Sequence, residues 1–300
     1  MNAASVKAKL KNISDTTGKN FQELLIAYGL ERTIYRLSVS AYRKSFILKG
    51  GIFLYALSNG NYSRATTDIY FLAKHISNDL DSIKCVFTEI FSIEADDPME
   101  FDTASIVVKP ITEFKEYHGV NISTVAYLER TRIPISIDIG FGDVIYPDEV
   151  EMEFPCLVSE KPPVIMAYSL DTSIAEKFEA IVSLGYDNSR FKDFYDIYVW
   201  MKRTAFDGET LAEACRETFT HRQTSLERIV AFEPGFADDA VRASRWKAFA
   251  KKKKILLDVT LEETIEGIRE FMVPVIDAIV AEEKFEYQWS PEEMRWNRSE

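Results

Sequence analysis

The chain has 300 residues, of which 46% are hydrophobic and 28% charged, a composition typical of a folded protein with one large domain or two modest ones. The formal net charge is −12, so the surface as a whole repels nucleic acids and anionic membranes, and a polyanionic partner requires a local basic patch. No apolar run reaches the length of a membrane span, the N-terminus lacks the apolar core of a signal peptide, and the three cysteines lack metal-binding spacing. We therefore expect a cytoplasmic protein that does not engage a membrane and has no disulfide framework.

The first half of the chain mixes helical and strand-like patterns. Apolar residues recur at helical spacing over 20–46 and 77–91, and an apolar segment passes through a glycine pair into a helix that ends near Asn59 and Gly60. Strands are predicted over 66–75, 103–110, 118–129 and 132–142, with an acidic loop over 94–102. These elements predict an α+β domain with a mixed sheet.

The second half of the chain is predicted to be a bundle of helices. From Asp171 onward, strand-like alternation nearly vanishes and helical spacing takes over, with a capping box at Thr260 and Glu263. The predicted helices cover 171–186, 188–203, 207–221, 238–253 and 260–282. The change of pattern places a domain boundary near Val158, which divides the chain into residues 1–158 and 159–300. The tail after the last helix is acidic with two tryptophans, and it either covers part of the protein or binds a partner.

A glycine pair at the start of a predicted helix is the first candidate for a binding site. Gly50 and Gly51 follow Lys49, and glycines in this place let backbone N–H groups approach a phosphate, which the helix dipole also favours. Asp68, on the next predicted strand, would lie beside that phosphate. Glycine pairs also serve ordinary turns, so a purely structural role stays open at this point.

A single carboxylate interrupts an apolar strand further along the chain. Asp138 has isoleucines on both sides in the segment ISIDI, and a charge there is costly unless it is paired or holds a metal ion. An edge strand or a pairing with a nearby arginine would also explain it. Asp68 and Asp138 would both lie on strands of one sheet, and two such carboxylates predict a magnesium site.

Two helices of the second half carry further charges. Lys192, Asp193 and Asp196 share one helix face by their spacing. Lys177 borders the buried face of the preceding helix, which makes it a candidate phosphate ligand. A surface ion pair between Lys192 and Asp196 is the structural alternative, worth a few tenths of a kcal/mol.

Several common catalytic motifs are absent from the sequence. The histidines His75, His118 and His221 lack the spacing of a metal-binding helix. The sequence contains no GxSxG elbow, no GxGxxG fingerprint and no GxxxxGK[ST] loop. What remains is phosphate and magnesium chemistry without a P-loop.

Six segments, taken in order, resemble the AbiEii/AbiGii family of toxin nucleotidyltransferases. They are FILKGG, RATTDI, SIDIGFGD, IAEKFEAIVSLG, NSRFKDFYDIYVW and ETFTHRQT, and the resemblance spans about Leu24 to Phe271. Each segment alone is a weak signal, but six in the same order make a chance match improbable. The resemblance implies a polymerase-β-like minimal nucleotidyltransferase domain followed by a helical domain, in agreement with the patterns above.

The resemblance also implies a function. Members of this family are the toxins of type IV toxin–antitoxin and phage abortive-infection systems, and the characterised MenT group transfers nucleotides to the 3′ acceptor end of tRNA, which stops translation. We therefore expect a nucleotidyltransferase that uses an NTP and Mg²⁺, acts on tRNA and has an antitoxin protein as its partner. A nucleotidyltransferase of the same superfamily that acts on small molecules remains an alternative.

The family motifs assign roles to individual residues. The resemblance implies two metal ligands, Asp68 and Asp138. It implies that the nucleotide is bound by Lys49, Gly50, Gly51, Arg64, Thr66, Lys177, Arg190 and Lys192. It also implies that catalysis involves Asp68, Lys177, Asp193 and Asp196. Thr66 also stands where some relatives carry a residue that a kinase antitoxin phosphorylates, an alternative to inhibition by direct binding. Replacement of Lys177 or Asp68 by alanine is expected to abolish transfer without unfolding the protein.

One position departs from the family pattern. The family usually has a second aspartate two residues after Asp68, where this chain has Tyr70. Two carboxylates at that spacing on a strand point the same way and clamp a pair of metal ions, which a neutral tyrosine does not do. Three explanations stay open: a natural variant with an altered metal site, an inactivating substitution, or a catalytically impaired protein that only binds nucleotide or antitoxin.

A basic cluster in the second half is the candidate tRNA-binding surface. It consists of His221, Arg222, Arg242, Arg245, Lys247 and Lys251 to Lys254. Phosphate contacts dominate the affinity of proteins for nucleic acids, so an acidic protein depends on such a cluster. A solvated helix end without a partner is the alternative.

Overall fold

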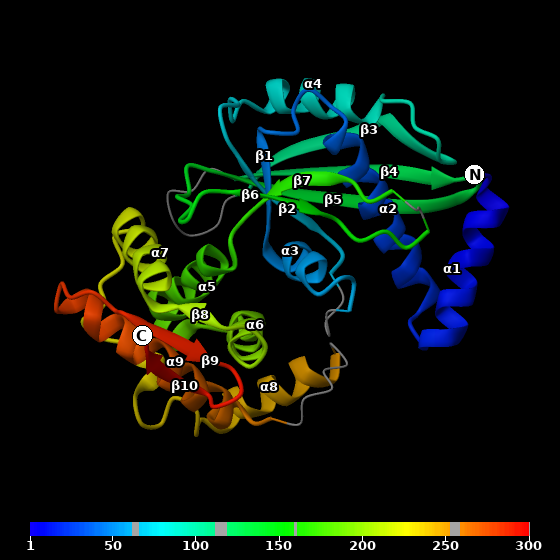
Figure 1. Ribbon diagram of the computed structural model, residues 1–300. Helices are drawn as coiled ribbons and strands as arrows, with labels where there is room; N and C mark the ends of the chain where they lie inside the picture. The colour runs from blue at the N-terminus through cyan, green and yellow to red at the C-terminus, as the bar shows by residue number, and fades with distance from the viewer. Residues whose placement is uncertain (62–65, 112–118, 159–160, 253–258, 300) are drawn as a thin grey trace. The chain divides into compact units, whose positions relative to one another are not determined.

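The computed structural model describes residues 1–61, 66–111, 119–158, 161–252 and 259–299 (Figure 1). Over these residues the chain divides into two compact units. The first consists of Met1–Asp143 and Glu149–Tyr168, and the second of Val144–Asp148 and Ser169–Glu300. The predicted domain boundary near Val158, between residues 1–158 and 159–300, stays a prediction. No helix in the described ranges is both long enough and apolar enough to cross a bilayer.

A seven-stranded mixed sheet forms the centre of the first unit, in the order β3-β4-β5-β2-β1-β7-β6. Its strands are β1 (Phe46–Lys49), β2 (Ile69–Ala73), β3 (Met99–Ile111), β4 (Gly119–Leu128), β5 (Thr131–Phe141), β6 (Val150–Glu153) and β7 (Val164–Ala167). The pairs β2–β5 and β1–β7 are parallel and the other pairs are antiparallel. The helices of this unit are α1 (Ala3–Thr17), α2 (Phe21–Ser38), α3 (Gly50–Leu57) and α4 (Leu80–Phe91). The predicted α+β class with a mixed sheet is confirmed.

One face of this sheet is apolar because every second residue of β5 is an isoleucine. Ile133, Ile135, Ile137 and Ile139 are all buried, as the two-residue period of a strand requires. Helix α2 packs against Ile133 and Ile135 at Gly29, where a Cβ atom would lie 2.8 Å from the Ile133 side chain. The intervening residues of β5, among them Asp138, therefore project from the opposite face.

The predicted acidic loop over 94–102 is wrong in its second half, because β3 already begins at Met99. Asp97 and Met99 are held by a side chain distant in sequence. Arg36 of α2 donates hydrogen bonds to both carboxylate oxygens of Asp97 and to the Met99 carbonyl oxygen. This buried ion pair neutralises an acidic segment whose composition is typical of an exposed loop.

The second unit is mainly helical, as predicted, but it also contains a small sheet. Its helices are α5 (Leu170–Leu184), α6 (Phe191–Met201), α7 (Gly208–His221), α8 (Ala240–Lys252) and α9 (Leu261–Val280), with 3₁₀ turns η1 (Gly185–Asp187) and η2 (Val230–Phe232). The strands β8 (Phe206–Asp207), β9 (Tyr287–Ser290) and β10 (Arg295–Arg298) form a sheet in the order β10-β9-β8. The tail that the sequence left unassigned is thus a hairpin, drawn in red in Figure 1.

Two tryptophans anchor this hairpin to the helices of its own unit. The Trp289 side chain is 1% exposed and its indole N–H donates to the Met201 carbonyl oxygen. Trp296 stacks on Phe271 of α9, with ring centroids 5.5 Å apart, and donates to the Phe271 carbonyl oxygen. The tail therefore covers part of the protein, one of the two roles that its sequence allowed.

Replacement of Trp289 by alanine is expected to lower the free energy of unfolding of the second unit by about 3–5 kcal/mol, because it removes a buried aromatic side chain and leaves the Met201 carbonyl without its donor. Chemical denaturation followed by circular dichroism measures the change. Tyr287→Ala, on the exposed side of the same hairpin, serves as the control and should cost far less. Equal losses for both variants would contradict this account of the hairpin.

Candidate active site

The strand register places four polar side chains in one row across the sheet of the first unit. Tyr70 of β2 lies opposite Asp138 of β5, which lies opposite Asn121 of β4, and on the other side Tyr70 lies opposite Lys49 of β1. Residues directly opposite in a sheet point to the same face. Asp68 lies in the bend directly before β2, two residues before Tyr70. The row thus brings together the predicted site residues Lys49 and Asp138 with Tyr70, and Asp68 lies just before β2 in the chain.

Hydrogen bonds hold the two candidate metal carboxylates. Asn121 donates to Asp138 Oδ1 over 2.7 Å, and the Thr67 hydroxyl donates to Asp68 Oδ2 over 2.9 Å. Thr66 bonds through its hydroxyl to the Asp68 carbonyl oxygen. Arg64, also predicted to bind nucleotide, lies outside the described residues. Asn121 is a site residue that the sequence reasoning missed, because its partner becomes visible only once β4 is paired with β5.

The glycine pair begins a helix, as predicted. Gly50 and Gly51 open α3 directly after β1, with Lys49 in the N-cap position and Gly50 at a φ of 71°. Such a φ favours glycine. A Cβ atom at position 50 would also lie 3.2 Å from the Tyr70 ring. Gly50 therefore allows the turn into α3 and leaves room for the ring of Tyr70, the residue at the position where the resemblance implies a second aspartate.

A buried ion cluster links α5 with α6 in the second unit. The Lys177 ammonium donates to Asp193 over 3.2 Å and to Asp196 over 2.8 Å, and Arg190 pairs with the other oxygen of Asp193. Asp193 is 1% exposed and Asp196 is fully buried. The predicted surface location of Asp196 is therefore wrong, since Asp196 is buried and binds Lys177. Lys192 itself is partly exposed beside this cluster.

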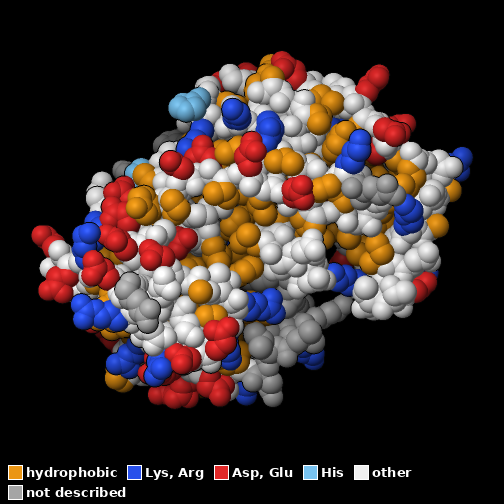
Figure 2. Space-filling model, in the orientation of Figure 1, with side chains coloured by type: hydrophobic (Ala, Val, Ile, Leu, Met, Phe, Trp, Pro, Cys, Tyr) orange, Lys and Arg blue, Asp and Glu red, His pale blue; other side chains and the backbone are white. Residues whose placement is uncertain are grey.

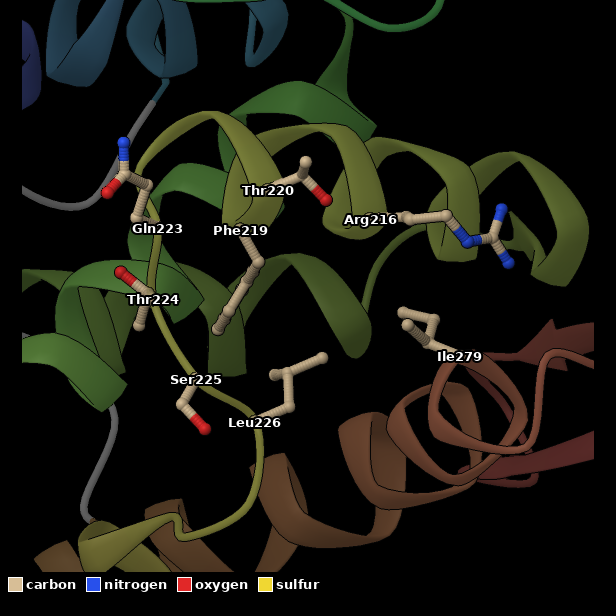
Figure 3. A pocket seen from close by; sticks show the side chains of 8 residues that line it. All are labelled: Arg216, Phe219, Thr220, Gln223, Thr224, Ser225, Leu226 and Ile279. Atoms are coloured by element: carbon tan, nitrogen blue, oxygen red, sulfur yellow. The ribbon is translucent and has the colours of Figure 1, made fainter.

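The segment ETFTHRQT ties the end of α7 to α5. Arg222 pairs with Glu176 and Glu179, and the Thr224 hydroxyl donates to Glu179. Figure 3 shows the pocket beside this connection, with a volume of about 320 Å³. It is lined by Arg216, Phe219, Thr220, Gln223, Thr224, Ser225, Leu226 and Ile279, which include none of the predicted site residues. The motif therefore has a structural role in joining the two helices.

The predicted basic cluster is smaller than its sequence implies. Arg222 is used in the ion pairs with α5, and Arg242 donates to the Phe236 and Tyr186 carbonyl oxygens while it stacks on the Phe236 ring. The exposed members on α8 are Arg245, Lys247, Lys251 and Lys252. Lys253 and Lys254 lie outside the described residues.

The donor set of the first unit fits a magnesium ion. Mg²⁺ prefers oxygen ligands and is commonly held by one or two carboxylates together with water and substrate phosphates. Asp138 on β5 and Asp68, directly before the neighbouring strand β2, supply two carboxylates. The described residues contain no cluster of three or more acidic, histidine or cysteine side chains suited to a metal. Within these residues Asp68 and Asp138 are thus two candidate ligands and do not form a complete metal site.

Comparison with known families identifies the chain. The family model of the AbiEii nucleotidyl transferase toxins of type IV toxin–antitoxin systems matches residues 32–281. The chain belongs to this family. It is thus a nucleotidyltransferase toxin, and the family implies an NTP substrate and an antitoxin partner. No curated protein sequence matches it significantly.

Two solved structures share the fold of this AbiEii family member at low sequence identity. A Helicobacter pylori protein described as a candidate nucleotidyltransferase has a TM-score of 0.52 and 14% identity, over 89% of this chain and 100% of its own. The nucleotidyltransferase toxin MenT4 of Mycobacterium tuberculosis has a TM-score of 0.51 and 14% identity, over 93% of this chain and 99% of its own. At this identity the likeness supports the fold, which is that of nucleotidyltransferases.

Lys177→Met is expected to lower the free energy of unfolding by about 3–5 kcal/mol, because it leaves two buried carboxylates without their ammonium partner. Arg190→Gln should cost less than about 1 kcal/mol, since the Arg190 side chain is 45% exposed. Urea denaturation of the two variants beside the wild type measures the difference. A similar loss for both would mean that the Lys177 cluster contributes no more than a surface pair. Because substitution of Lys177 is expected to destabilise the protein, a substitution of Asp68, which is only partly buried, tests the role in activity more specifically.

Proposed function

We propose that this toxin transfers a nucleoside monophosphate from an NTP to the 3′ acceptor end of tRNA and thereby blocks translation. The observation that carries the proposal is the placement of Lys49 and Asp138 on one sheet face, with Asp68 directly before the strand between theirs and with the glycine pair that begins α3. Carboxylates for a metal ion and free N–H groups for phosphates are the two requirements of nucleotidyl transfer. The family resemblance implies tRNA as the acceptor, and the choice of acceptor in this proposal is based on that resemblance.

In this proposal the chain acts by binding and orienting charged groups. The N–H groups at the start of α3 and the Lys49 ammonium hold the triphosphate, and Asn121 keeps the Asp138 carboxylate turned toward the site. Mg²⁺ held by Asp68 and Asp138 neutralises phosphate charge when bound. The 3′ hydroxyl oxygen of the acceptor forms the new bond to the α-phosphorus as the bond to pyrophosphate breaks. The contribution of Lys177, Asp193, Asp196, Arg190 and Lys192 to transfer is proposed on the resemblance alone.

The tRNA surface is proposed to lie on α8 of the second unit. Figure 2 shows acidic and basic side chains interspersed over the face in view, without one dominant basic patch. The exposed residues Arg245, Lys247, Lys251 and Lys252 succeed one another along one helix. A run of this kind supplies the local positive charge that an acidic protein requires for RNA.

The antitoxin is proposed to act either by direct binding or by phosphorylation of Thr66. Thr66 is only partly buried and lies two residues before Asp68. A phosphate at this position would add negative charge beside the carboxylates and repel the nucleotide triphosphate. Phosphorylation would place the inhibitory event two residues from Asp68.

Purified protein incubated with Mg²⁺, total tRNA and each α-labelled NTP should produce labelled tRNA on a denaturing gel. Asp68→Asn and removal of the metal with EDTA should both abolish the label, because the first removes a proposed ligand of the metal and the second removes the metal that would neutralise phosphate charge. Tyr70→Asp is run beside the wild type. Label only from Tyr70→Asp would show that Tyr70 silences a competent enzyme, and no label on tRNA from either protein would overturn the proposed acceptor.

Arg245→Glu combined with Lys247→Glu is expected to weaken tRNA binding and to reduce the salt dependence of the affinity by about one unit of logarithmic slope for each lost phosphate contact. Filter binding over a series of salt concentrations gives both values. Lys9→Glu combined with Lys11→Glu, at exposed positions on α1, controls for the same change in net charge. Unchanged affinity in the double variant would remove α8 from the RNA surface.

A further inference from the structure

The ammonium group of Lys49 is already bound to an anion within the protein. Lys49 Nζ lies 2.8 Å from Asp143 Oδ2, and the two side chains are only 14% and 9% exposed. The Tyr168 ring lies below the same ammonium, 4.9 Å from it, and is itself buried. The lysine that precedes the glycine pair is thus held in a largely desolvated ion pair, in which electrostatic interactions are stronger than at the surface.

Two glycines bring Asp143 to this position. The chain leaves β5 through Phe141 and turns at Gly142, whose φ of 85° lies in the left-handed region. The turn places the Asp143 carboxylate over the sheet, where a Cβ atom at Gly140 would lie 3.8 Å from Asp143 Oδ2. Gly140 points to the same face as Asp138, two residues before it. The end of the segment SIDIGFGD therefore places a second carboxylate on the face of β5 that carries Asp138.

The position of Asp143 has a consequence for the nucleotide. An ammonium that donates to a buried carboxylate has fewer N–H groups for a phosphate, and the carboxylate repels the phosphate charge. We propose that Asp143 competes with the triphosphate for Lys49 and so sets the affinity of the toxin for its nucleotide. This inference rests on the proposed role of Lys49 in nucleotide binding.

Competition and positioning predict opposite effects of an Asp143 substitution on the affinity for phosphate. Competition predicts tighter binding, and a role of Asp143 in orienting Lys49 predicts weaker binding. Asp143→Asn keeps the size of the side chain and an oxygen that accepts from Lys49, but it removes the negative charge. If Asp143 competes, the variant should bind inorganic tripolyphosphate about tenfold more tightly, the size of one hydrogen bond to a charged group. If Asp143 merely orients Lys49, the variant should bind more weakly.

The experiment is isothermal titration of the full chain with tripolyphosphate at constant ionic strength. It compares the wild type, Asp143→Asn, Lys49→Met and the control Glu149→Gln. Glu149 pairs with Lys74 in the same unit, so its substitution removes another partly buried carboxylate without touching Lys49. The control should bind like the wild type, and Lys49→Met should lose at least tenfold in affinity.

The outcomes separate the two proposals. Tighter binding by Asp143→Asn alone supports the competition, whereas unchanged or weaker binding overturns it and leaves the role of Lys49 intact. Unchanged binding by Lys49→Met would instead overturn the proposed nucleotide site. If Asp143→Asn is too unstable to titrate, the melting temperatures of the variant and the wild type are compared with and without tripolyphosphate. Competition predicts that tripolyphosphate raises the melting temperature of the variant more than that of the wild type. An equal or smaller rise for the variant contradicts the competition.

Discussion

The parallel pairing of β2 with β5 is the constraint on which the proposed site depends. It sets Tyr70 opposite Asp138, and the strand period then decides every other position on that face. The apolar face packs against α2, because Ile133 and Ile135 lie against Gly29. A shift of the register by one residue would turn the isoleucines to the polar face and the carboxylates into the core. Burial of the apolar face therefore protects the arrangement of the charged one.

Charge is managed differently at the proposed site and in the ion cluster of the second unit. At the proposed site Asp68 and Asp138 are partly exposed and accept hydrogen bonds from the neutral donors Thr67 and Asn121. In the second unit Asp193 and Asp196 are buried, and one ammonium bonds to both. A buried charge without its partner is costly, so substitution of the buried members Lys177, Asp193 and Asp196 is expected to destabilise the protein. The partly exposed face, in contrast, is free to exchange its protein partners for a ligand.

The sequence predicted most of the elements near the proposed site but few of the contacts between them. The glycine pair before α3 and the isoleucine alternation of β5 are local signals, and both structures form as predicted. The acidic segment that enters β3 was misassigned because its charge is neutralised by Arg36, about sixty residues away in the chain. The partners of Asp138 and Lys49 were missed for the same reason, since pairing across strands leaves no local pattern. The roles of these residues in nucleotide transfer remain predictions.

Tyr70 is better explained as an accommodated residue than as a disruption. Its ring lies against Gly50, where any larger residue would come within 3.2 Å of it. A second aspartate at this position would add a further negative charge opposite Asp138. The tyrosine instead places its ring against the glycine turn, so the fold holds this residue without a carboxylate there. The choice between a natural variant of the metal site and an inactivated one therefore depends on the chemistry of the site and not on packing: a site that works with the carboxylates of Asp68 and Asp138 alone would transfer nucleotides without an aspartate at position 70.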